Sequence, residues 1–554
     1  MAFWQQSKHL VRETLSDDHR QPSLPYRMNQ PSARPVRPID EGTRLAVAFG
    51  SILLLAIAVA VVTFATLRSP LKDDIAWLLY VARRWMAGRE LYVDVVEVNP
   101  PLIVWISAIP LEIAGWLDVG VKYVAMPGFM AAVLGCAWWS ATLLRRSGSL
   151  FADRIPVFAA IGTVFLIVPA GDLGQREHLL VAAVLPYLIL FAGELEGRSP
   201  RFLQAIFAGS LAGLGCALKP RYAGAFAVLE CVALCHGLRP WRTLPIAAGS
   251  AMAIYGLSVA VFCPAYLRRA VPLALALYGA TDVSFRELLL DSAILMAGEA
   301  AAVCLLWLRW RHLPERRLFL TIVMFAATST AICFVDGKDW FYHRLPATIV
   351  TVLALLGMAV STYVHRRTTT HRIRLPLALA AMAVMIFAIT TYQRLEPEVA
   401  EAVEPRDNTV ARLEALVRKE HARTYIAFSE WIALGFPVVN NTGVAWASRF
   451  DSMWALKGEL WRARFDPSAS REWPVARWVA HDFIAGCPDI AVVDGRESTN
   501  YIGVLSASDP AFARAWSRYR QIAAFDGLTV YRRGKGGCID PWVATGTAAA
   551  TDIR

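Results

Sequence analysis

The sequence predicts a polytopic α-helical membrane protein with about eleven transmembrane helices, juxtamembrane helices in its first outer loop, and a soluble α/β domain at its C-terminus. Two observations predict this class. The 554 residues are 56% hydrophobic and only 18% charged, with a mean hydropathy of +0.42, which is too apolar for a soluble chain of this length. Apolar runs of roughly 17 to 25 residues also recur along the chain, and a helix of that length crosses about 30 Å of hydrocarbon.

The first 44 residues are polar and contain five prolines. Such a segment cannot bury a core, so we expect a disordered cytoplasmic tail over residues 1–44. The first apolar run begins near Leu45, which is too far from the start for a cleavable secretory signal.

The membrane domain is expected over residues 45–392. Its spans are predicted at about 45–67, 121–144, 154–170, 179–194, 202–218, 222–237, 243–263, 287–308, 317–335, 345–364 and 375–392.

The apolar stretch 100–116 is short, contains Glu112, and is interrupted by Pro101 and Pro110. If it does not cross, five arginine-bearing loops fall on the same side as the basic N-terminal tail, as the positive-inside rule requires. We therefore expect this stretch to be a helix along the outer surface. The N-terminus is then cytoplasmic, and residues 393–554 lie outside.

Those last residues alternate strand-like and helix-like runs, which predicts an outer α/β domain. The runs "TYIAFS", "DIAVVDG" and "LTVYRR" are typical of strands, whereas "DPAFARAWSRYRQI" is typical of a helix. Cys487 and Cys538 are the only cysteines in this tail. We expect them to form a disulfide if their strands lie side by side in an oxidising compartment.

The formal charge of +11 comes mainly from Lys and Arg in short loops between apolar runs, where such residues set membrane orientation. We therefore expect membrane lipids around the chain and no nucleic acid as a partner. None of the nine cysteines has the CxxC spacing of a zinc site.

The first outer loop, "LKDDIAWLLYVARRWMAGRELYVDVVEVNPPLIVWI", carries four acidic candidates on an amphipathic background: Asp73, Asp74, Asp94 and Glu97. Asp73 and Asp74 open a predicted helix. They could simply complement the helix N-terminus, which acidic side chains favour by up to about 1 kcal/mol. They could equally place a carboxylate at the membrane surface for chemistry.

The order of motifs in this loop supports the second interpretation. Asp74 is followed eight positions later by Ala82-Arg83-Arg84, then by Gly88, Pro100-Pro101-Leu102 and Trp105. This order resembles the first periplasmic loop of the GT-C glycosyltransferase superfamily, in the branch of the lipid A aminoarabinose transferases and the protein O-mannosyltransferases. Two departures concern sugar specificity: Asn99 stands where many members have Lys, and Asp73-Asp74 replaces the usual Asp-Glu.

The resemblance implies an inverting glycosyltransferase of a bacterial inner membrane that uses a polyprenyl-phosphate-linked sugar and a periplasmic lipid or glycan acceptor. It implies that Asp74 is the catalytic carboxylate, with Asp73 as the second choice. The carboxylate would act as general base on the acceptor hydroxyl. The phosphate leaving group would need cations more than a general acid.

Cations and aromatic side chains for that role occur in the outer motifs "GQREH", "LKPRY" and "GKDWFYHRLP", and in Arg268 and Arg269. Single members could instead snorkel to the interface or belong to an aromatic belt. The candidate donor- and acceptor-binding residues are Asp94, Glu97, Asn99, Arg176, Glu177, His178, Lys219, Arg221, Lys338, Trp340, Tyr342, His343 and Arg344.

No cofactor is expected. His178 and His343 could join Glu177 and Asp339 at a metal, but their spacings match no dedicated site, so no metal ligands are predicted and a divalent cation is left open.

The rival class is a transporter or flippase of lipid-linked glycans, which would place ionisable residues at mid-membrane depth and show internal repeats. The sequence shows neither pattern. A ligase of surface glycans that uses the same lipid donors is compatible with the sequence as well.

Overall fold

The computed structural model describes residues 41–146, 153–364, 374–404, 408–466 and 468–534. The chain separates into a short unit, Met1–Val47, and one compact unit from Ala48 onward that contains the functional region. Helix α1 (Glu41–Arg68) begins four residues before residue 45, where the first span is expected to start. The expectation of disorder is therefore wrong for residues 41–44, because Glu41 can open the helix by complementing its N-terminal dipole. Residues 1–40 lie outside the described part.

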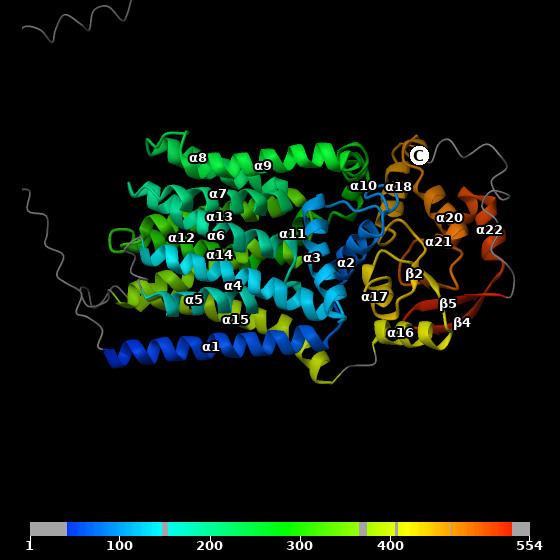
Figure 1. The fold of residues 1–554 in the computed structure, drawn as a ribbon, viewed down its shortest axis with the longest axis horizontal. Coiled ribbons are helices and arrows are strands. Elements are labelled where there is room, and N and C mark those ends of the chain that lie inside the picture. The colour runs from blue at the N-terminus through cyan, green and yellow to red at the C-terminus, as the bar shows by residue number, and fades with distance from the viewer. Residues whose placement is uncertain (1–40, 147–152, 365–373, 405–407, 467, 535–554) are drawn as a thin grey trace, which may run out of the picture. The chain divides into compact units, whose positions relative to one another are not determined.

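Ten of the eleven predicted spans coincide with one helix each, and the span 287–308 coincides with two helices; Figure 1 shows most of these helices running side by side. Besides α1 these are α4 (Lys122–Arg146), α5 (Arg154–Ile167), α6 (Arg176–Leu195), α7 (Phe202–Leu218), α8 (Ala223–Cys235), α9 (Thr243–Phe262), α12 (Ala293–Arg309), α13 (Arg316–Asp336), α14 (Phe341–Val364) and α15 (Arg374–Val403).

Within the described residues, six helices are long and apolar enough to cross a membrane: α1, α4, α6, α9, α13 and α14. A seventh is reached if α11 (Phe285–Asp291) and α12 form one bent span. The chain is therefore a multi-pass membrane protein. The full count of eleven stays a prediction, because α5, α7 and α8 are shorter than the roughly 20 residues that a helix needs to span the hydrocarbon.

The expected span 287–308 is not one continuous helix. It is broken at Ser292, where α11 and α12 meet at 60°. Asp291 and Ser292 stand at the break, and short polar side chains of this kind favour helix ends because they compete for backbone hydrogen bonds.

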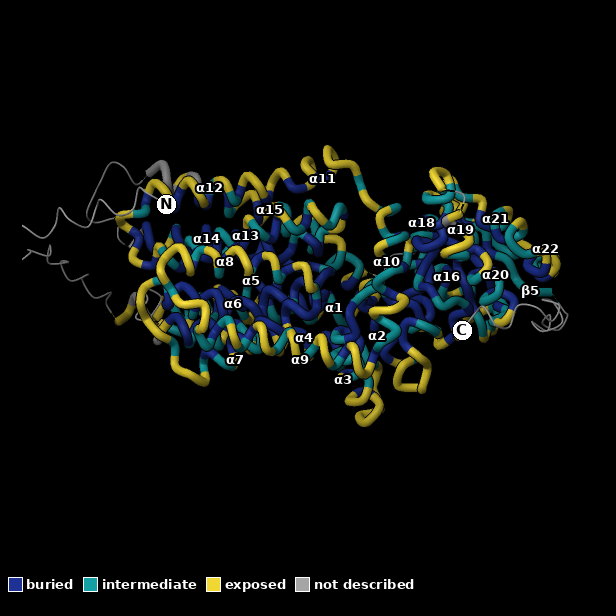
Figure 2. Tube along the Cα trace, turned by 90° about the horizontal axis from the view of Figure 1, so that it is seen from above, coloured by how far each residue is buried: buried dark blue, intermediate teal, exposed yellow. Residues whose placement is uncertain are grey.

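Helix α6 lies at the centre of the helical bundle, with nearly all of its residues buried, whereas α9 and α12 carry many exposed residues (Figure 2). Helices α7 and α9 approach closely through Gly209 and Gly213. A Cβ atom added at these glycines would lie 2.5 Å from the carbonyl oxygen of Leu244 and 2.4 Å from that of Ala248. Small residues four apart permit such contact between membrane helices.

The first outer loop forms α2 (Asp73–Met86) and α3 (Pro101–Leu117), as expected. Figure 1 shows α3 running across the direction of the long helices, next to α2. Its exposed apolar residues Ile109, Ile113, Trp116 and Leu117 recur at helical spacing. Such a face suits a bilayer surface, although the position of α3 in a membrane stays a prediction.

The described part of the tail contains a five-stranded sheet in the order β2-β1-β3-β5-β4. The strands are β1 (Thr424–Phe428), β2 (Ala445–Trp446), β3 (Ile490–Asp494), β4 (Tyr519–Phe525) and β5 (Leu528–Arg533). Strands β2, β1 and β3 pair in parallel, whereas β3, β5 and β4 pair antiparallel. The intervening helices include α16 (Thr409–Lys419), α17 (Val438–Thr442), α18 (Trp454–Ala463), α20 (Val475–Gly486), α21 (Tyr501–Ser508) and α22 (Pro510–Trp516).

Three of these strands lie where the sequence predicts strands, but the run "DPAFARAWSRYRQI" is only half helical. Helix α22 ends at Trp516, and β4 begins at Tyr519. The turn Asp526-Gly527 explains why the second half of this run is a strand. Both residues have positive φ, and they join β4 to β5 as a tight hairpin. Pairing with β5 then draws Tyr519 and the residues after it into the sheet.

Cys487, at the end of α20, is disulfide-bonded. Its predicted partner, Cys538, lies outside the described residues.

Candidate active site

A cavity of about 750 Å³ lies where the first outer loop, the ends of several long helices and the tail meet. Its walls come from the start of α2, the loop before α3, the start of α6, the start of α14, and three loops of the tail sheet. Of the residues predicted for the site, it collects Asp73, Asp74, Glu97, Asn99, Arg176, Trp340 and Tyr342.

Asp74 stands in the first turn of α2 and faces another helix rather than capping its own. One of its oxygens accepts a 3.1 Å hydrogen bond from the side-chain amide of Gln175, which precedes α6. Burial and the neighbouring carboxylate of Asp73 raise the pKa of Asp74, while Arg176, Lys72 and the Gln175 hydrogen bond act in the opposite direction. Asp74 is thus a better proton acceptor than an ordinary aspartate.

Asp73 has local partners. Its carboxylate accepts the backbone N–H of Asp74 at 2.9 Å and lies 3.8 Å from the amino group of Lys72. Asp73 therefore stabilises the N-terminus of α2, as acidic residues in a first helical turn do, although it also lines the cavity.

Glu97 connects the loop to α2. Its carboxylate accepts the indole N–H of Trp77 at 2.5 Å and the backbone N–H of Asn99 at 2.8 Å, and the side-chain amide of Asn99 donates to it as well. These bonds hold Asn99 at the cavity wall. Asp94, in contrast, is exposed and accepts the backbone N–H of Glu90 at 3.0 Å, and it does not line the cavity.

Arg176 is a buried cation in the cavity wall, only 3% exposed. Its guanidinium lies 3.9 Å from the carboxylate of Glu177, but Glu177 binds the amino group of Lys219 more closely, at 2.8 Å. The tighter pair leaves much of the positive charge of Arg176 facing the cavity.

Other members of the basic motifs form ion pairs behind this wall. Arg221 and His343 both contact Asp336, with the His343 ring nitrogen 3.0 Å from the carboxylate. His178 accepts the backbone N–H of Gly174 at 3.2 Å through Nδ1. Glu177, His178, Lys219, Arg221 and His343 therefore lie outside the cavity lining, and their predicted role in binding stays a prediction.

The motif "GKDWFYHRLP" divides between the cavity and its surroundings. Trp340 and Tyr342 line the cavity as expected, and so does Phe341 between them. Lys338 turns away and donates to the carbonyl oxygen of Tyr278 at 2.8 Å, while Arg344 donates to the carbonyl oxygen of Asp339 at 2.7 Å. These two cations fasten loops together outside the lining.

None of the predicted site residues comes from the tail, although the tail contributes much of the cavity lining. The stretch "FSEWIALGFPVVNNTGVAWASRFDSMW" is rich in the aromatic and small polar residues of carbohydrate-binding surfaces, but this pattern favours an ordinary domain core. The cavity residues of the tail follow the ends of the three parallel strands: Glu430 and Trp431 after β1, Asp451, Ser452 and Trp454 after β2, and Glu497 and Ser498 after β3. Ligands of α/β proteins often bind outside the carboxyl ends of parallel strands. Polar residues directly after "TYIAF" and "DIAVVD" were therefore the signal that could have identified them.

Hydrogen bonds between strand ends fix these tail loops. The hydroxyl of Ser429 lies 2.9 Å from a carboxylate oxygen of Asp494 and 2.7 Å from one of Glu497, and Glu497 accepts the backbone N–H of Glu430 at 2.8 Å. Glu430 in turn pairs with Lys457 at 2.6 Å. The tail wall of the cavity is thus a connected polar network.

The pKa of Asp451 is strongly shifted. Its carboxylate accepts the backbone N–H of Ser452 at 2.7 Å and the indole N–H of Trp454 at 2.8 Å. Burial, helped by the negative charge of Glu97, nevertheless raises the pKa of Asp451 to about 7. At neutral pH this side chain is therefore about half protonated.

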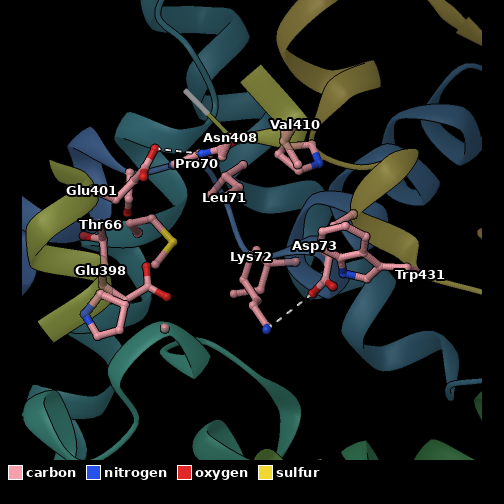
Figure 3. Close-up of a pocket in the computed structure, with 17 residues that line it drawn as sticks. Thr66, Pro70, Leu71, Lys72, Asp73, Glu398, Glu401, Asn408, Val410 and Trp431 are labelled. Atoms are coloured by element: carbon pink, nitrogen blue, oxygen red, sulfur yellow. Dashed lines mark hydrogen bonds and ion pairs between the residues drawn. The ribbon is translucent and has the colours of Figure 1, made fainter. Parts of the chain in front are cut away.

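An adjoining cavity of about 300 Å³ shares Lys72, Asp73 and Trp431 with the larger one. Figure 3 shows the amino group of Lys72 beside the carboxylate of Asp73, and Glu401 of α15 beside Asn408. Lys72 and Trp431 thus form part of the partition between the two cavities. Among the described residues, no group of three or more His, Cys, Asp or Glu side chains is arranged to hold a metal ion.

Two comparisons with known proteins return nothing: no family model matches the sequence, and no curated protein does. Among solved structures, a crystal structure of ArnT from Cupriavidus metallidurans bound to undecaprenyl phosphate is similar to this chain, with 13% identity and a TM-score of 0.49. The match covers 87% of this chain and 97% of that one. At this identity and TM-score the likeness assigns no residue of this chain a role.

Proposed function

We propose that this chain is an inverting GT-C-type glycosyltransferase of a bacterial inner membrane. It transfers a hexosyl or pentosyl unit from a polyprenyl-phosphate donor to a lipid or glycan acceptor on the periplasmic side. The observation that carries the proposal is the position of Asp74. The acid singled out by the family resemblance lines the large cavity at the ends of the membrane helices, in the electrostatic field of the buried Arg176.

Asp74 acts as the general base. Its carboxylate accepts the proton of the acceptor hydroxyl while the hydroxyl oxygen attacks the anomeric carbon of the donor. The bond from that carbon to the phosphate oxygen breaks, and its electron pair leaves with the polyprenyl phosphate. A single displacement of this kind inverts the anomeric centre. Asp73 is less suited to the role because it already accepts a backbone N–H and lies beside Lys72.

Arg176 is the cation best placed to stabilise the leaving phosphate. Four cations line the cavity. Arg394 and Lys457 have close carboxylate partners, Asp172 at 2.7 Å and Glu430 at 2.6 Å, and Lys72 lies 3.8 Å from Asp73. The carboxylate nearest to Arg176, that of Glu177, lies 3.9 Å from Arg176 but only 2.8 Å from Lys219. Donors already in place where negative charge develops lower a barrier without reorganisation.

Aromatic side chains surround these charged groups. Trp340, Tyr342 and Tyr278 come from the membrane helices and their loops, and Trp431 and Trp454 from the tail. Their ring faces suit the apolar faces of a sugar, while nearby carboxylates can accept its hydroxyl groups. We therefore place the donor sugar between the two sets of rings.

A transfer assay with purified full-length protein tests the proposal. Several polyprenyl-phosphate sugars, with undecaprenyl carriers among them, are incubated with native lipid extracts, and glycosylated product is followed by mass spectrometry. Asp74→Asn should lower the rate about a hundredfold to ten-thousandfold, the usual cost of losing a general base. Asp94→Asn is the matched control, because Asp94 lies in the same loop but outside the cavity.

Near-normal transfer by Asp74→Asn would refute this mechanism. The rival functions give other results in the same experiment. A flippase would move lipid-linked donor across a vesicle membrane without forming product, and a ligase would transfer a preassembled glycan rather than a single sugar.

The proposed topology is tested separately with reporter fusions. Fusions after Arg317, at the start of α13, should report the cytoplasm, whereas fusions after Glu404, beyond α15, should report the periplasm. The opposite result at either position would overturn the proposed orientation of the cavity.

A further inference from the structure

A second cavity, of about 250 Å³, lies apart from the candidate active site and shares none of its lining residues. Three segments distant in sequence build it. Tyr92, Val93 and Val96 come from the first outer loop, a single turn of π-helix at Tyr266–Ala270 provides Arg268 and Arg269, and the tail provides Arg449, Trp473 and Trp478. The backbone N–H of Val96 donates to the carbonyl oxygen of Arg449 at 2.7 Å and joins two of these segments.

The charges of this cavity do not cancel. Arg449 is neutralised by Asp482, which accepts from its guanidinium at 2.8 and 2.9 Å. Glu472 also lines the cavity and lies 3.6 Å from Arg462. In the part of the chain that the structure describes, no carboxylate pairs with Arg268 or Arg269, and both side chains are exposed. Two adjacent guanidinium groups therefore line the cavity without an ion-pair partner among the described residues, and Glu472 in the same lining lies nearer to Arg462.

One residue that lines the cavity, Trp473, has a buried N–H group with no acceptor among the described residues. Burying an N–H group without a partner is unfavourable, and such groups in folded proteins usually mark a site where a ligand or water completes the bond. The ring of Trp478 stands edge-on to that of Trp473, with centroids 6.4 Å apart, and adds an apolar surface.

The position of the cavity indicates where its ligand comes from. Tyr266 follows closely after Phe262, the last residue of α9, which is one of the helices able to cross a membrane. If α9 crosses the membrane, the arginine pair lies just beyond the end of the span, near the level of the lipid headgroups.

We propose that this second cavity binds a phosphate group, held by Arg268, Arg269 and the indole N–H of Trp473. Two planar guanidinium forks and a separate N–H offer more donors than the two oxygens of a carboxylate accept well, whereas a phosphate monoester presents three oxygens. A membrane amphiphile would bring its phosphate to the arginines with its chains directed toward α9. The site does not depend on the proposed transfer reaction, since it is separate from Asp74 and its cavity.

Isothermal titration calorimetry on the full-length protein in a zwitterionic detergent tests this site. The probes are short-chain phosphatidic acid, phosphatidylcholine of the same chain length, and inorganic phosphate. Phosphatidic acid should bind at least tenfold more tightly than phosphatidylcholine. Inorganic phosphate that binds as tightly as phosphatidic acid would identify free phosphate as the source of the group, and much weaker binding would identify a lipid headgroup.

Two variants connect that binding to the cavity. Arg268→Gln with Arg269→Gln should weaken phosphatidic acid binding at least tenfold. Arg83→Gln with Arg84→Gln should leave it unchanged, because this adjacent pair at the end of α2 carries the same charge but does not line the cavity. Trp473→Phe keeps the ring but removes the N–H and should weaken binding severalfold, which provides a test even if the double arginine variant fails to fold. Equal affinity in all variants, or equal affinity for the two lipids, would overturn the proposal.

Discussion

The side-chain amide of Gln175 donates a 3.1 Å hydrogen bond to the carboxylate of Asp74, from a position 101 residues later in the chain. Gln175 is completely buried and directly precedes α6, the most deeply buried long helix of the bundle. The proposed base is therefore attached to the most deeply buried of the long helices, through a residue that is itself completely buried. A carboxylate held in this way keeps its direction toward the cavity.

The hydrogen bond also predicts a shift in pH dependence. It stabilises the charged form of Asp74 and so lowers a pKa that burial raises. Gln175→Leu should raise that pKa further, because it removes a hydrogen bond that stabilises the charged form. Since the base works only when deprotonated, the acidic limb of kcat/KM should move to higher pH.

The measurement is a pH profile of transfer for Gln175→Leu beside Gln204→Leu. Gln204 lies within α7 and away from the cavity lining, so its substitution changes an amide to an apolar group without touching Asp74. An acidic limb that stays in place in Gln175→Leu would contradict the assignment of Asp74 as base.

Asp451 predicts a change of stability with pH. Its pKa of about 7 in the folded protein lies above the ordinary aspartate value of 3.8. Between about pH 4 and 7 the folded state holds a proton that the unfolded chain has released, so stability falls as pH rises through this window. Asp451→Asn cannot lose that proton. The variant should match the wild type near pH 4 and have the higher Tm at pH 8.

Thermal unfolding of both proteins at a series of pH values from 4 to 8 measures this difference. Asp466→Asn is the control, because hydrogen bonds from Ser468 lower the pKa of Asp466 and its substitution should show no such gain at high pH. A Tm difference between Asp451→Asn and wild type that does not grow across the window would contradict the raised pKa.

The contact between α7 and α9 predicts a position that is intolerant of size. A side chain at Gly213 would collide with the carbonyl oxygen of Ala248, only 2.4 Å from the new Cβ. Gly213→Val should destabilise the folded protein by about 1 to 3 kcal/mol, the usual cost of overpacking. Gly249→Val, on α9 where nothing lies within 4 Å, is the matched control. Thermal unfolding in detergent checks both, and equal effects would show that helix packing is not the cause.

The sequence predicted the membrane helices and the cavity side formed by α2 because both depend on local patterns. Apolar runs of spanning length located the helices, and the amphipathic spacing after Asp74 located α2. The break at Ser292 was missed because hydropathy averages over a window and does not register a single bend. Strand β4 was missed because its pairing with β5 overrides a helical pattern.

The tail side of the cavity depends on contacts over long sequence distances, which a single sequence does not reveal. Asp451 is more than 370 residues from Asp74, yet both line one cavity. The same limit explains Lys219 and Arg221. Each looks like a free cation in "LKPRY", but Glu177 and Asp336 neutralise them from other helices. A charge in a sequence is visible, whereas its counter-ion appears only in the fold.

The disulfide bond of Cys487 predicts that the tail lies in an oxidising compartment. Cys487 is disulfide-bonded, whereas the cysteines of the membrane helices are free: Cys136, Cys216, Cys231, Cys235, Cys263, Cys304 and Cys333. With Cys538 as its predicted partner, the native protein should alkylate at membrane cysteines only, and reduction should expose two further thiols. Removal of the bond should lower stability by about 2 to 4 kcal/mol. Two readily alkylated tail thiols before reduction would contradict the pairing.

A comparison of substitutions at Arg176 and Arg221 tests whether phosphate binds at Arg176 or responds only to the positive charge of the protein. Arg176 is buried in the cavity wall, whereas the side chain of Arg221 is 57% exposed and paired with Asp336 outside the lining. Arg176→Gln should raise the KM for the polyprenyl-phosphate donor and lower kcat, each about tenfold or more, because the same guanidinium would hold the ground-state phosphate and its leaving form. Arg221→Gln should change both by less than about threefold, since exposed ion pairs contribute about 1 kcal/mol or less.

Arg176→Lys keeps the charge but loses the planar fork of the guanidinium. It should therefore recover part of kcat, which a variant that simply fails to fold would not do. If Arg176→Gln and Arg221→Gln behave alike in a transfer assay with saturating acceptor, the phosphate does not bind at Arg176.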